Sequence, residues 1–279
     1  MSVAKRKHVF SDMLMTLVFG FLYMPIVVLI VFSFNSTKSR TVWTGFTLDW
    51  YRELLSDSMI MSSLQTTLLV SVIAAVAATV FGTFAAIGFF NMKRRWRRPL
   101  LTVNNIPLIN ADIITGVSLS LLFVSAAALL GFNLGFGTLL IAHITFNIPY
   151  VILSVTPKLY QLDRNISDAA QDLGCTWLQT IYRVIIPEIM PGIINGLLIA
   201  FTLSFDDFVI SYFTAGSEVQ TLSMTIYAMT RRRISPTINA ISTLLFVVVL
   251  VLLIVVNVRE ARQHSAMLKK ENILKGEAI

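Results

Sequence analysis

Long apolar segments alternate with short polar ones along the whole chain. A segment of 18 or more residues with few charges is long enough to cross a bilayer as a helix. Six such spans are predicted, at about 13–34, 62–90, 111–130, 137–159, 189–213 and 238–258. They use most of the 279 residues and leave no room for a separate soluble domain. The pattern therefore predicts an all-α integral membrane protein with one six-helix transmembrane domain over residues 1–279.

The composition agrees with this prediction. Apolar residues make up 56% of the chain and charged residues 13%, far from the averages of soluble domains. The first apolar segment follows Lys5, Arg6 and Lys7, as a secretory signal would, but it is too long for one and no small-residue cleavage pattern follows it. We expect a retained helix. The single cysteine, Cys175, excludes an intrachain disulfide.

The distribution of Lys and Arg predicts the orientation in the membrane. Basic residues stay preferentially on the cytoplasmic side. With the N-terminus inside, most of the 22 Lys and Arg residues fall in inner segments, so both termini are expected in the cytoplasm. The exception is Arg231–Arg233, which this topology places outside. The net charge of +7 then reflects topology and anionic lipid headgroups, and nucleic acid is not needed to explain it.

The longest inner loop, about residues 160–188, contains two short helical patterns. Asp163 or Ser167 can cap a first helix that runs to about Leu173 and ends at Gly174. A second, amphipathic segment at 176–186 is expected to stop at Pro187. Two short helices joined at a glycine suit insertion into a partner's groove. The alternative is an amphipathic loop that lies on the membrane surface.

Three aspartates lie within apolar spans: Asp112, Asp206 and Asp207. A charged residue at mid-membrane costs about 2.5–3.5 kcal/mol on insertion scales and is a functional-site hypothesis by default. His143 is the one basic residue expected well inside a span, and it is expected to be a hydrogen-bonded packing residue, because no second His or Cys lies at metal-ligand spacing. The negative charge could be balanced by protons, a metal ion or a cationic substrate. The structural alternative is that each aspartate hydrogen-bonds to a neighbouring helix.

The helical period separates the adjacent aspartates. In a continuous fifth span, Asp206 shares a face with Thr202, whereas Asp207 shares a second face, about 100° away, with Ser204 and Ser211. Only one aspartate needs to line a pathway, and the sequence leaves the choice open. Before the third span, prolines and clustered amides near Asp112 predict a broken or late-starting helix.

One motif resembles a known family. The run DAAQDLG at 168–174, followed by VIIP at 184–187, is similar to the cytoplasmic EAA loop of ABC-importer permeases, with Asp for the leading Glu, Val for Ile and Ile for Leu. The resemblance implies a type I importer permease fold. It also implies that this loop is the coupling element that docks onto an ATPase subunit, through Asp168, Ala169, Ala170, Gly174 and Pro187.

Five further stretches, at 23–38, 45–55, 142–151, 200–213 and 234–244, resemble the second permease subunit of spermidine/putrescine importers. This resemblance implies a transport subunit rather than an enzyme, in the bacterial cytoplasmic membrane. The implied partners are a homologous permease, forming a heterodimer, a dimer of ATP-binding subunits and an extracytoplasmic polyamine-binding protein. The pathway residues would be Asp207, Asp206, Asp112, Ser204 and Trp50.

Two roles are open for Trp50: it could anchor the chain at the membrane interface, or its aromatic face could receive an organic cation. No metal site or cofactor is expected on this chain. ATP and Mg²⁺ are expected on the partner ATPase, because the sequence contains no G-x4-GK[ST] phosphate loop.

Two rival functions stay open. An ABC permease for another solute would share the coupling loop, but a neutral or anionic substrate would leave the three aspartates unexplained. A stand-alone proton-coupled transporter could use the aspartates as a proton relay, but it would have no need of an ATPase-docking loop.

Overall fold

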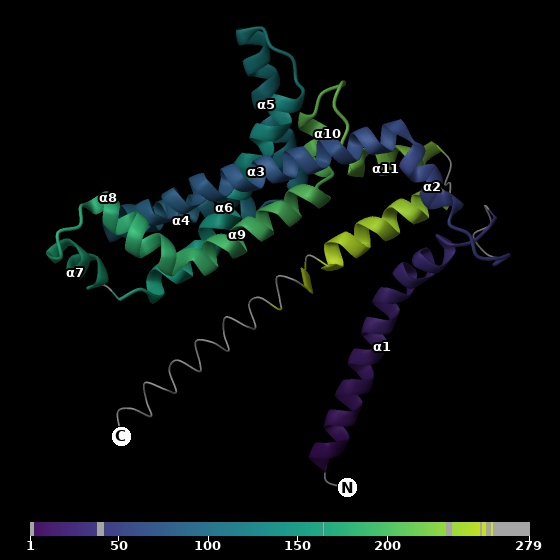
Figure 1. The fold of residues 1–279 in the computed structure, drawn as a ribbon, viewed down its shortest axis with the longest axis horizontal. Coiled ribbons are helices and arrows are strands. Elements are labelled where there is room, and N and C mark those ends of the chain that lie inside the picture. Colours follow the sequence, from purple (N-terminus) through teal and green to yellow (C-terminus); the bar gives the residue numbers. More distant parts are fainter. Residues whose placement is uncertain are drawn as a thin grey trace. The chain divides into compact units, whose positions relative to one another are not determined.

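The structure is a computed structural model that describes residues 3–37, 42–163, 165–232, 236–251, 253, 254 and 258 (Figure 1). These residues are helical apart from loops and one isolated bridge between Asn35 and Phe46. Five helical segments are long and apolar enough to cross a membrane: Met13–Phe32, Ser58–Asn91, Asp112–Leu130, Phe136–Gln161 and Trp177–Asp206. A shorter apolar helix covers Pro236–Val251, and most of the rest of the predicted sixth span lies outside the described residues. The predicted all-helical membrane fold is confirmed.

The chain divides into two compact units, residues 1–62 with 225–250, and residues 63–224 with 251–279. The first unit holds α1 (Val3–Phe32), α2 (Asp49–Ser56), most of α11 (Leu222–Arg232) and the helix Pro236–Val251. Arg231, from the exceptional basic run, lies over the ring of Tyr227 at 5.0 Å, and Arg233 is outside the described residues.

Asn35 organises the segment between α1 and α2. Its side chain is fully buried, its Nδ2 donates to the Val42 carbonyl at 2.9 Å, and its Oδ1 accepts from both Thr44 N–H and Thr44 Oγ1 at 3.0 Å. The Trp50 indole N–H donates to the Asn35 carbonyl oxygen at 2.6 Å. Buried amides need such partners, so Asn35 and Trp50 fix the described ends of this loop against each other.

The core of the second unit is a packed set of three helices, α3 (Ser58–Asn91), α6 (Phe136–Gln161) and α9 (Ile186–Asp206) (Figure 1). Small residues spaced four apart line the packed faces of two of them, on α3 Ala74, Ala78, Gly82 and Ala86, and on α9 Gly192, Gly196 and Ala200. Small residues on one face let membrane helices approach closely. A Cβ at Gly82 would stand 2.8 Å from Val151 of α6, and one at Gly196 would stand 3.2 Å from the same side chain.

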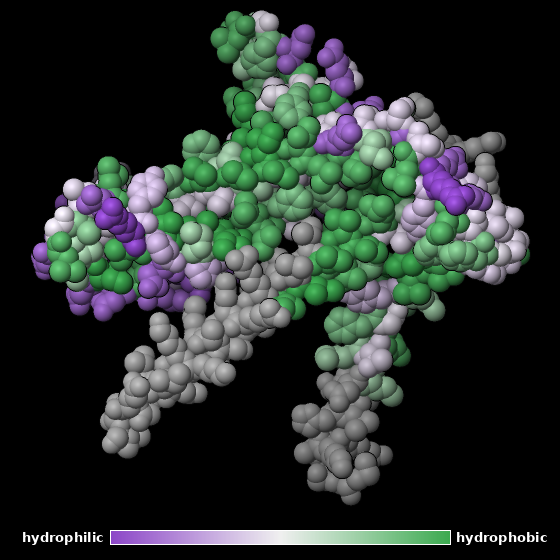
Figure 2. All heavy atoms as spheres, viewed as in Figure 1, coloured by the Kyte–Doolittle hydropathy of each residue, from purple (hydrophilic) through white to green (hydrophobic). Residues whose placement is uncertain are grey.

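Two shorter elements complete this unit. Helix α4 (Arg94–Ile109) ends at Asn110, and α5 (Asp112–Leu130) starts afresh after Ala111, which confirms the predicted break before the third span. Helix α5 packs on α10 (Val209–Thr214), where a Cβ at Gly116 would stand 3.1 Å from Phe213. Hydrophobic residues cover much of the visible face of the helices in Figure 2, and hydrophilic residues gather at the end that carries α7 (Ile166–Asp172) and α8 (Trp177–Thr180).

The predicted continuous fifth span, 189–213, is wrong. Helix α9 ends at Asp206, the Asp207 backbone is extended (φ −65°, ψ 129°), and α10 begins at Val209. The helix breaks here because the Asp207 carboxylate accepts the backbone N–H groups of Ile210 and Ser211, which a continuous helix would bond to its own carbonyls. The predicted faces of the two aspartates assumed a continuous helix, so that geometry does not hold beyond residue 206.

The inner loop follows the prediction only in part. Helix α7 ends with Gly174 at φ +88°, a left-handed conformation that favours glycine, as expected. Its N-cap residue is Asn165 rather than Asp163 or Ser167, because Asp163 bonds the Asn165 N–H instead. The second segment, α8 and the π-helical turn η1 (Ile181–Ile185), does not stop at Pro187 but runs into α9. The π-helical turn η1 ends two residues before Pro187, so the regular α-helical hydrogen-bond pattern is already interrupted where the proline lacks its N–H.

Candidate functional site

The adjacent aspartates have opposite surroundings. Asp206 is exposed at the end of α9, and within the described part of the chain no hydrogen bond or salt bridge reaches its carboxylate. The Asp207 side chain is only 8% exposed. Its Oδ1 accepts the Ile210 N–H at 3.2 Å, and its Oδ2 accepts the Ser211 N–H at 2.7 Å and the Ser211 hydroxyl at 2.9 Å. Asp207 is therefore the cap of the first turn of α10.

His143 of α6 connects the two sides of the helix break. Its imidazole is 1% exposed, with Nδ1 3.0 Å from Ser204 Oγ on α9 and Nε2 3.1 Å from Ser211 Oγ on α10. Nε2 also lies 3.6 Å from the Asp207 carboxylate. His143 is thus a buried, hydrogen-bonded residue, as the sequence predicts.

Asn147 extends the hydrogen-bond chain around His143. Asn147 Nδ2 can only donate, and it donates to Ser204 Oγ at 2.7 Å. Ser204 Oγ in turn hydrogen-bonds to Nδ1 of His143, and Nε2 hydrogen-bonds to Ser211 Oγ. Ser211 Oγ donates to the Asp207 carboxylate. The result is a chain of hydrogen bonds that joins α6, α9 and α10.

Asp112 is the first residue of α5 and is exposed. It precedes Gly116, which packs on α10, by one helical turn. Asp112 and Asp207 therefore belong to neighbouring helices of the same unit.

The five predicted pathway residues thus fall into three groups. Ser204 and Asp207 are brought together around His143 and are buried; Asp206 and Asp112 are exposed in the same unit. Trp50 belongs to the first unit, where its indole N–H donates a hydrogen bond to the Asn35 carbonyl oxygen. Sequence reasoning missed the contact of His143 with both serines. The available signal was one histidine and two serines at similar depths of two predicted spans. This signal is informative only once α6 is known to pack against α9.

Asp168, Ala169 and Ala170 of the predicted coupling residues belong to α7, which is at the end of the second unit where hydrophilic residues gather (Figure 2), and Pro187 belongs to α9. Asp168, Ala169, Gly174 and Pro187 are exposed, and Ala170 is buried. Large apolar side chains that no sequence motif marks lie beside them: Leu173, Trp177, Leu178 and Tyr182 are 87%, 57%, 61% and 60% exposed. A group of exposed apolar residues next to polar ones is typical of a protein interface.

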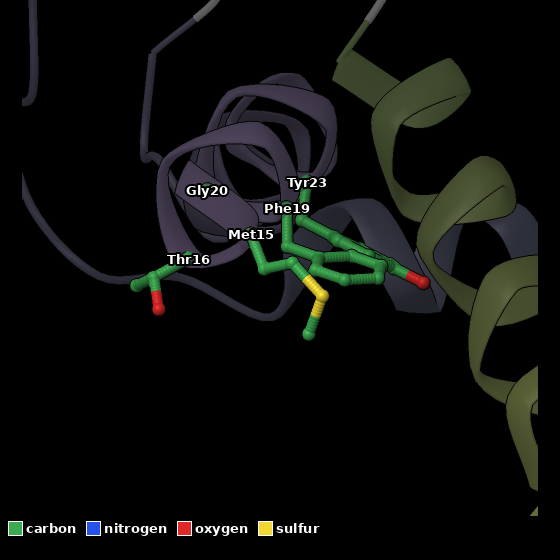
Figure 3. Close-up of a pocket in the computed structure, with 5 residues that line it drawn as sticks. All are labelled: Met15, Thr16, Phe19, Gly20 and Tyr23. Carbon is green, nitrogen blue, oxygen red and sulfur yellow. The ribbon is translucent and has the colours of Figure 1, made fainter. Parts of the chain in front are cut away.

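A concave surface on α1 is a poor candidate for the site. Met15, Phe19 and Tyr23 follow one side of this helix at spacings of four, with Thr16 and Gly20 beside them (Figure 3). The Phe19 and Tyr23 rings stack with centroids 6.4 Å apart. All five lining residues come from a single helix and none is charged, so this surface offers no carboxylate to pair with a cation.

Comparisons with known proteins agree on one family. A family model described as the binding-protein-dependent transport system inner membrane component matches residues 78–260. The chain is 42% identical over 230 residues to the putrescine transport system permease protein PotI of Escherichia coli K12, covering 81% of this chain and 82% of that protein. It is 36% identical over 240 residues to the spermidine/putrescine transport system permease protein PotC of the same strain, covering 86% and 89%.

Solved structures support the fold. A bacterial ABC transporter that imports the acidic polysaccharide alginate superposes with a TM-score of 0.68 at 17% identity, covering 93% of this chain and 97% of that one. The MetNI methionine ABC transporter, in an inward-facing conformation, gives a TM-score of 0.61 at 18% identity, covering 75% and 98%. These likenesses concern the fold alone. The chain belongs to the family of inner-membrane permease components of binding-protein-dependent ABC importers.

Proposed function

We propose that this chain is a permease subunit of an ATP-driven polyamine importer and forms part of the translocation pathway. The observation that carries the proposal is the similarity, over more than four fifths of the chain, to two permeases named for putrescine and for spermidine/putrescine. The solved structures share only the fold and import unlike solutes, so they do not bear on the substrate.

The carboxylates supply a physical reason for a cationic substrate. Asp206 and Asp112 are exposed in the helices α9 and α5, which contain no Lys or Arg. Lys158 is in the last turn of α6, and Arg183 is in η1, before α9 begins. Each charge costs about 2.5–3.5 kcal/mol within a bilayer unless it is paired or hydrated. A polyamine carries several positive charges along a flexible chain. Two exposed carboxylates on different helices, Asp206 of α9 and Asp112 of α5, suit such a linear polycation better than a compact ion.

The loop at 160–188 is the proposed contact with the ATPase. Asp168 and Ala169 of α7 and the apolar side chains Leu173 and Trp177 are exposed on this end of the second unit. The rigid continuation of α8 through η1 into α9 would carry a displacement of this loop directly to Asp206. ATP and Mg²⁺ would bind to the partner ATPase dimer and not to this chain.

The remaining partners follow from the family. We propose a heterodimer with a homologous permease and delivery of substrate by an extracytoplasmic polyamine-binding protein; one solved relative of the fold was crystallised with its periplasmic protein. Both termini would be cytoplasmic. A cysteine introduced at Arg231 should then react with a membrane-impermeant reagent added from outside, and reaction only from the cytoplasmic side would reverse the proposed topology.

Uptake into proteoliposomes that contain the full importer tests the substrate class. Labelled putrescine and spermidine should accumulate with ATP and compete with each other, whereas a neutral sugar or an amino acid should neither accumulate nor compete. Uptake of a neutral solute without any polyamine uptake would favour an ABC permease for another substrate.

The energy source distinguishes an ATP-driven importer from a proton-coupled transporter. ATP-driven uptake should persist when a protonophore collapses the proton gradient. An importer that is inactive with ATP but active with a proton gradient, and a chain that retains no ATPase on pull-down, would overturn the coupling role of residues 160–188.

A further inference from the structure

The break between α9 and α10 gives the adjacent aspartates different electrostatic positions. Asp207 caps the start of α10, where the partial positive charge of a helix N-terminus stabilises a carboxylate. Asp206 is at the C-terminal end of α9, where the partial negative charge of the helix adds to its own. That position destabilises an anion but attracts a cation. Neighbouring residues must therefore keep the end of α9, and with it Asp206, in this unfavourable position.

Buried side chains from three helices supply that structure. His143 of α6, Ser204 of α9 and Ser211 of α10 are each at most 3% exposed, and His143 bonds both serines. The Ser211 hydroxyl donates a hydrogen bond to the Asp207 carboxylate at 2.9 Å. Buried this deeply, these groups cannot meet a solute in the observed conformation. They are instead arranged to fix the end of α9 against the start of α10.

We propose that His143 is a positioning residue. With Ser204, Ser211 and Asp207 it forms a clamp across the α9–α10 break, and this clamp holds Asp206 as the carboxylate of the pair that receives the cation. Asp207 then acts within the clamp and not on the substrate. That Asp206 receives a cation rests on the proposed function, whereas the geometry of the clamp is independent of it.

Cysteine labelling measures the clamp without any substrate. In a Cys175→Ser background, Asp206→Cys reports on the exposed position, and Thr202→Cys, one turn earlier on α9, is the matched control before the break. His143→Phe keeps a ring but loses both hydrogen bonds. It should change the rate at which the thiol at position 206 reacts with a cationic reagent at least about fivefold, the scale of losing one ordinary hydrogen bond. The rate for the thiol at position 202 should not change.

Unchanged labelling at both positions in His143→Phe, or an equal change at both, would overturn the clamp. Ser211→Ala is a second variant, for use if His143→Phe fails to fold. It removes the link between His143 and Asp207 but leaves the Asp207 bonds to the Ile210 and Ser211 backbone, so it should give a smaller change, confined to position 206.

Transport kinetics supply the second readout. Because His143 and Asp207 act in one clamp, His143→Phe combined with Asp207→Asn should reduce kcat/KM for spermidine no further than the stronger single variant, roughly tenfold. His143→Gln, which can donate and accept, should recover part of this loss. Additive losses would contradict a shared clamp. Absence of polyamine uptake by the wild-type importer would count against the proposed function, while the labelling would still decide the clamp.

Discussion

Close packing of α3 on α6 at Gly82 can be tested with one methyl group. A Cβ at this position would lie 2.8 Å from both Cβ and Cγ1 of Val151 and 3.3 Å from the Ile148 carbonyl oxygen. Real Cβ atoms do not approach this closely, so Gly82→Ala must push α3 away from α6. Overpacking of this kind costs about 1–3 kcal/mol.

Gly88, on the same helix, is the matched control. A Cβ there would meet no atom within 4 Å. Both substitutions gain the same helix propensity, about 0.8–1.0 kcal/mol, so the difference between them isolates the packing cost. Gly82→Ala should therefore be less stable than Gly88→Ala by about 1–3 kcal/mol, which corresponds to roughly 2–4 °C in Tm for each kcal/mol.

The assay is thermal unfolding of the purified protein in detergent, followed by the loss of the monodisperse peak. Val151→Ala removes Cγ1, one of the two Val151 atoms that the new methyl would meet at 2.8 Å, and keeps Cβ. It should therefore relieve part of the overpacking, with a coupling to Gly82→Ala of about 0.5 kcal/mol in the stabilising direction. Equal Tm values for Gly82→Ala and Gly88→Ala would refute the packing described for α3 and α6.

Three further substitutions test single local features. Gly174→Ala places a side chain at φ +88°, at a cost of about 1–2 kcal/mol, and should weaken retention of the ATPase on pull-down, whereas normal retention would exclude this turn from docking. Thr176→Ala removes the cap that accepts the Gln179 N–H and should lower the free energy of unfolding by about 1 kcal/mol; an unchanged Tm would contradict it. Trp50→Phe leaves the Asn35 carbonyl without its indole donor and should cost about 1–3 kcal/mol in the same assay, and no loss would show that this bond is dispensable.

The spans could be predicted because hydrophobic length is read directly from the sequence. The start of α5 at Asp112 and the end of α7 at Gly174 were also predictable, since proline, amides and glycine restrict the backbone locally. The same holds for the coupling loop, whose motif is contiguous in the chain. Local backbone chemistry and segment length therefore determine most of the element pattern.

The helix break at Asp207 could not be predicted in the same way. SFDDFVI reads as continuous helix because its apolar residues give no signal of an end, and the break depends on one side chain bonding two backbone N–H groups. The role of His143 depends on the pairing of α6 with α9, through Gly192, Gly196 and Val151, which no local pattern encodes. The choice between the two aspartates was open for this reason.

The small residues on α3 and α9 were visible in the sequence but had no assigned meaning. Their spacing of four marks a packed face only once the partner helix is known, because alanine and glycine are common in all membrane spans.

The most direct test of the account is ATP-dependent uptake of spermidine by the reconstituted importer, wild type against Asp206→Asn. The substitution preserves size and removes the exposed charge at the end of α9. We predict protonophore-insensitive accumulation by the wild type and its loss in Asp206→Asn, with assembly and the Tm unchanged. Wild-type uptake by an intact Asp206→Asn importer would contradict the claim that this carboxylate receives the cation.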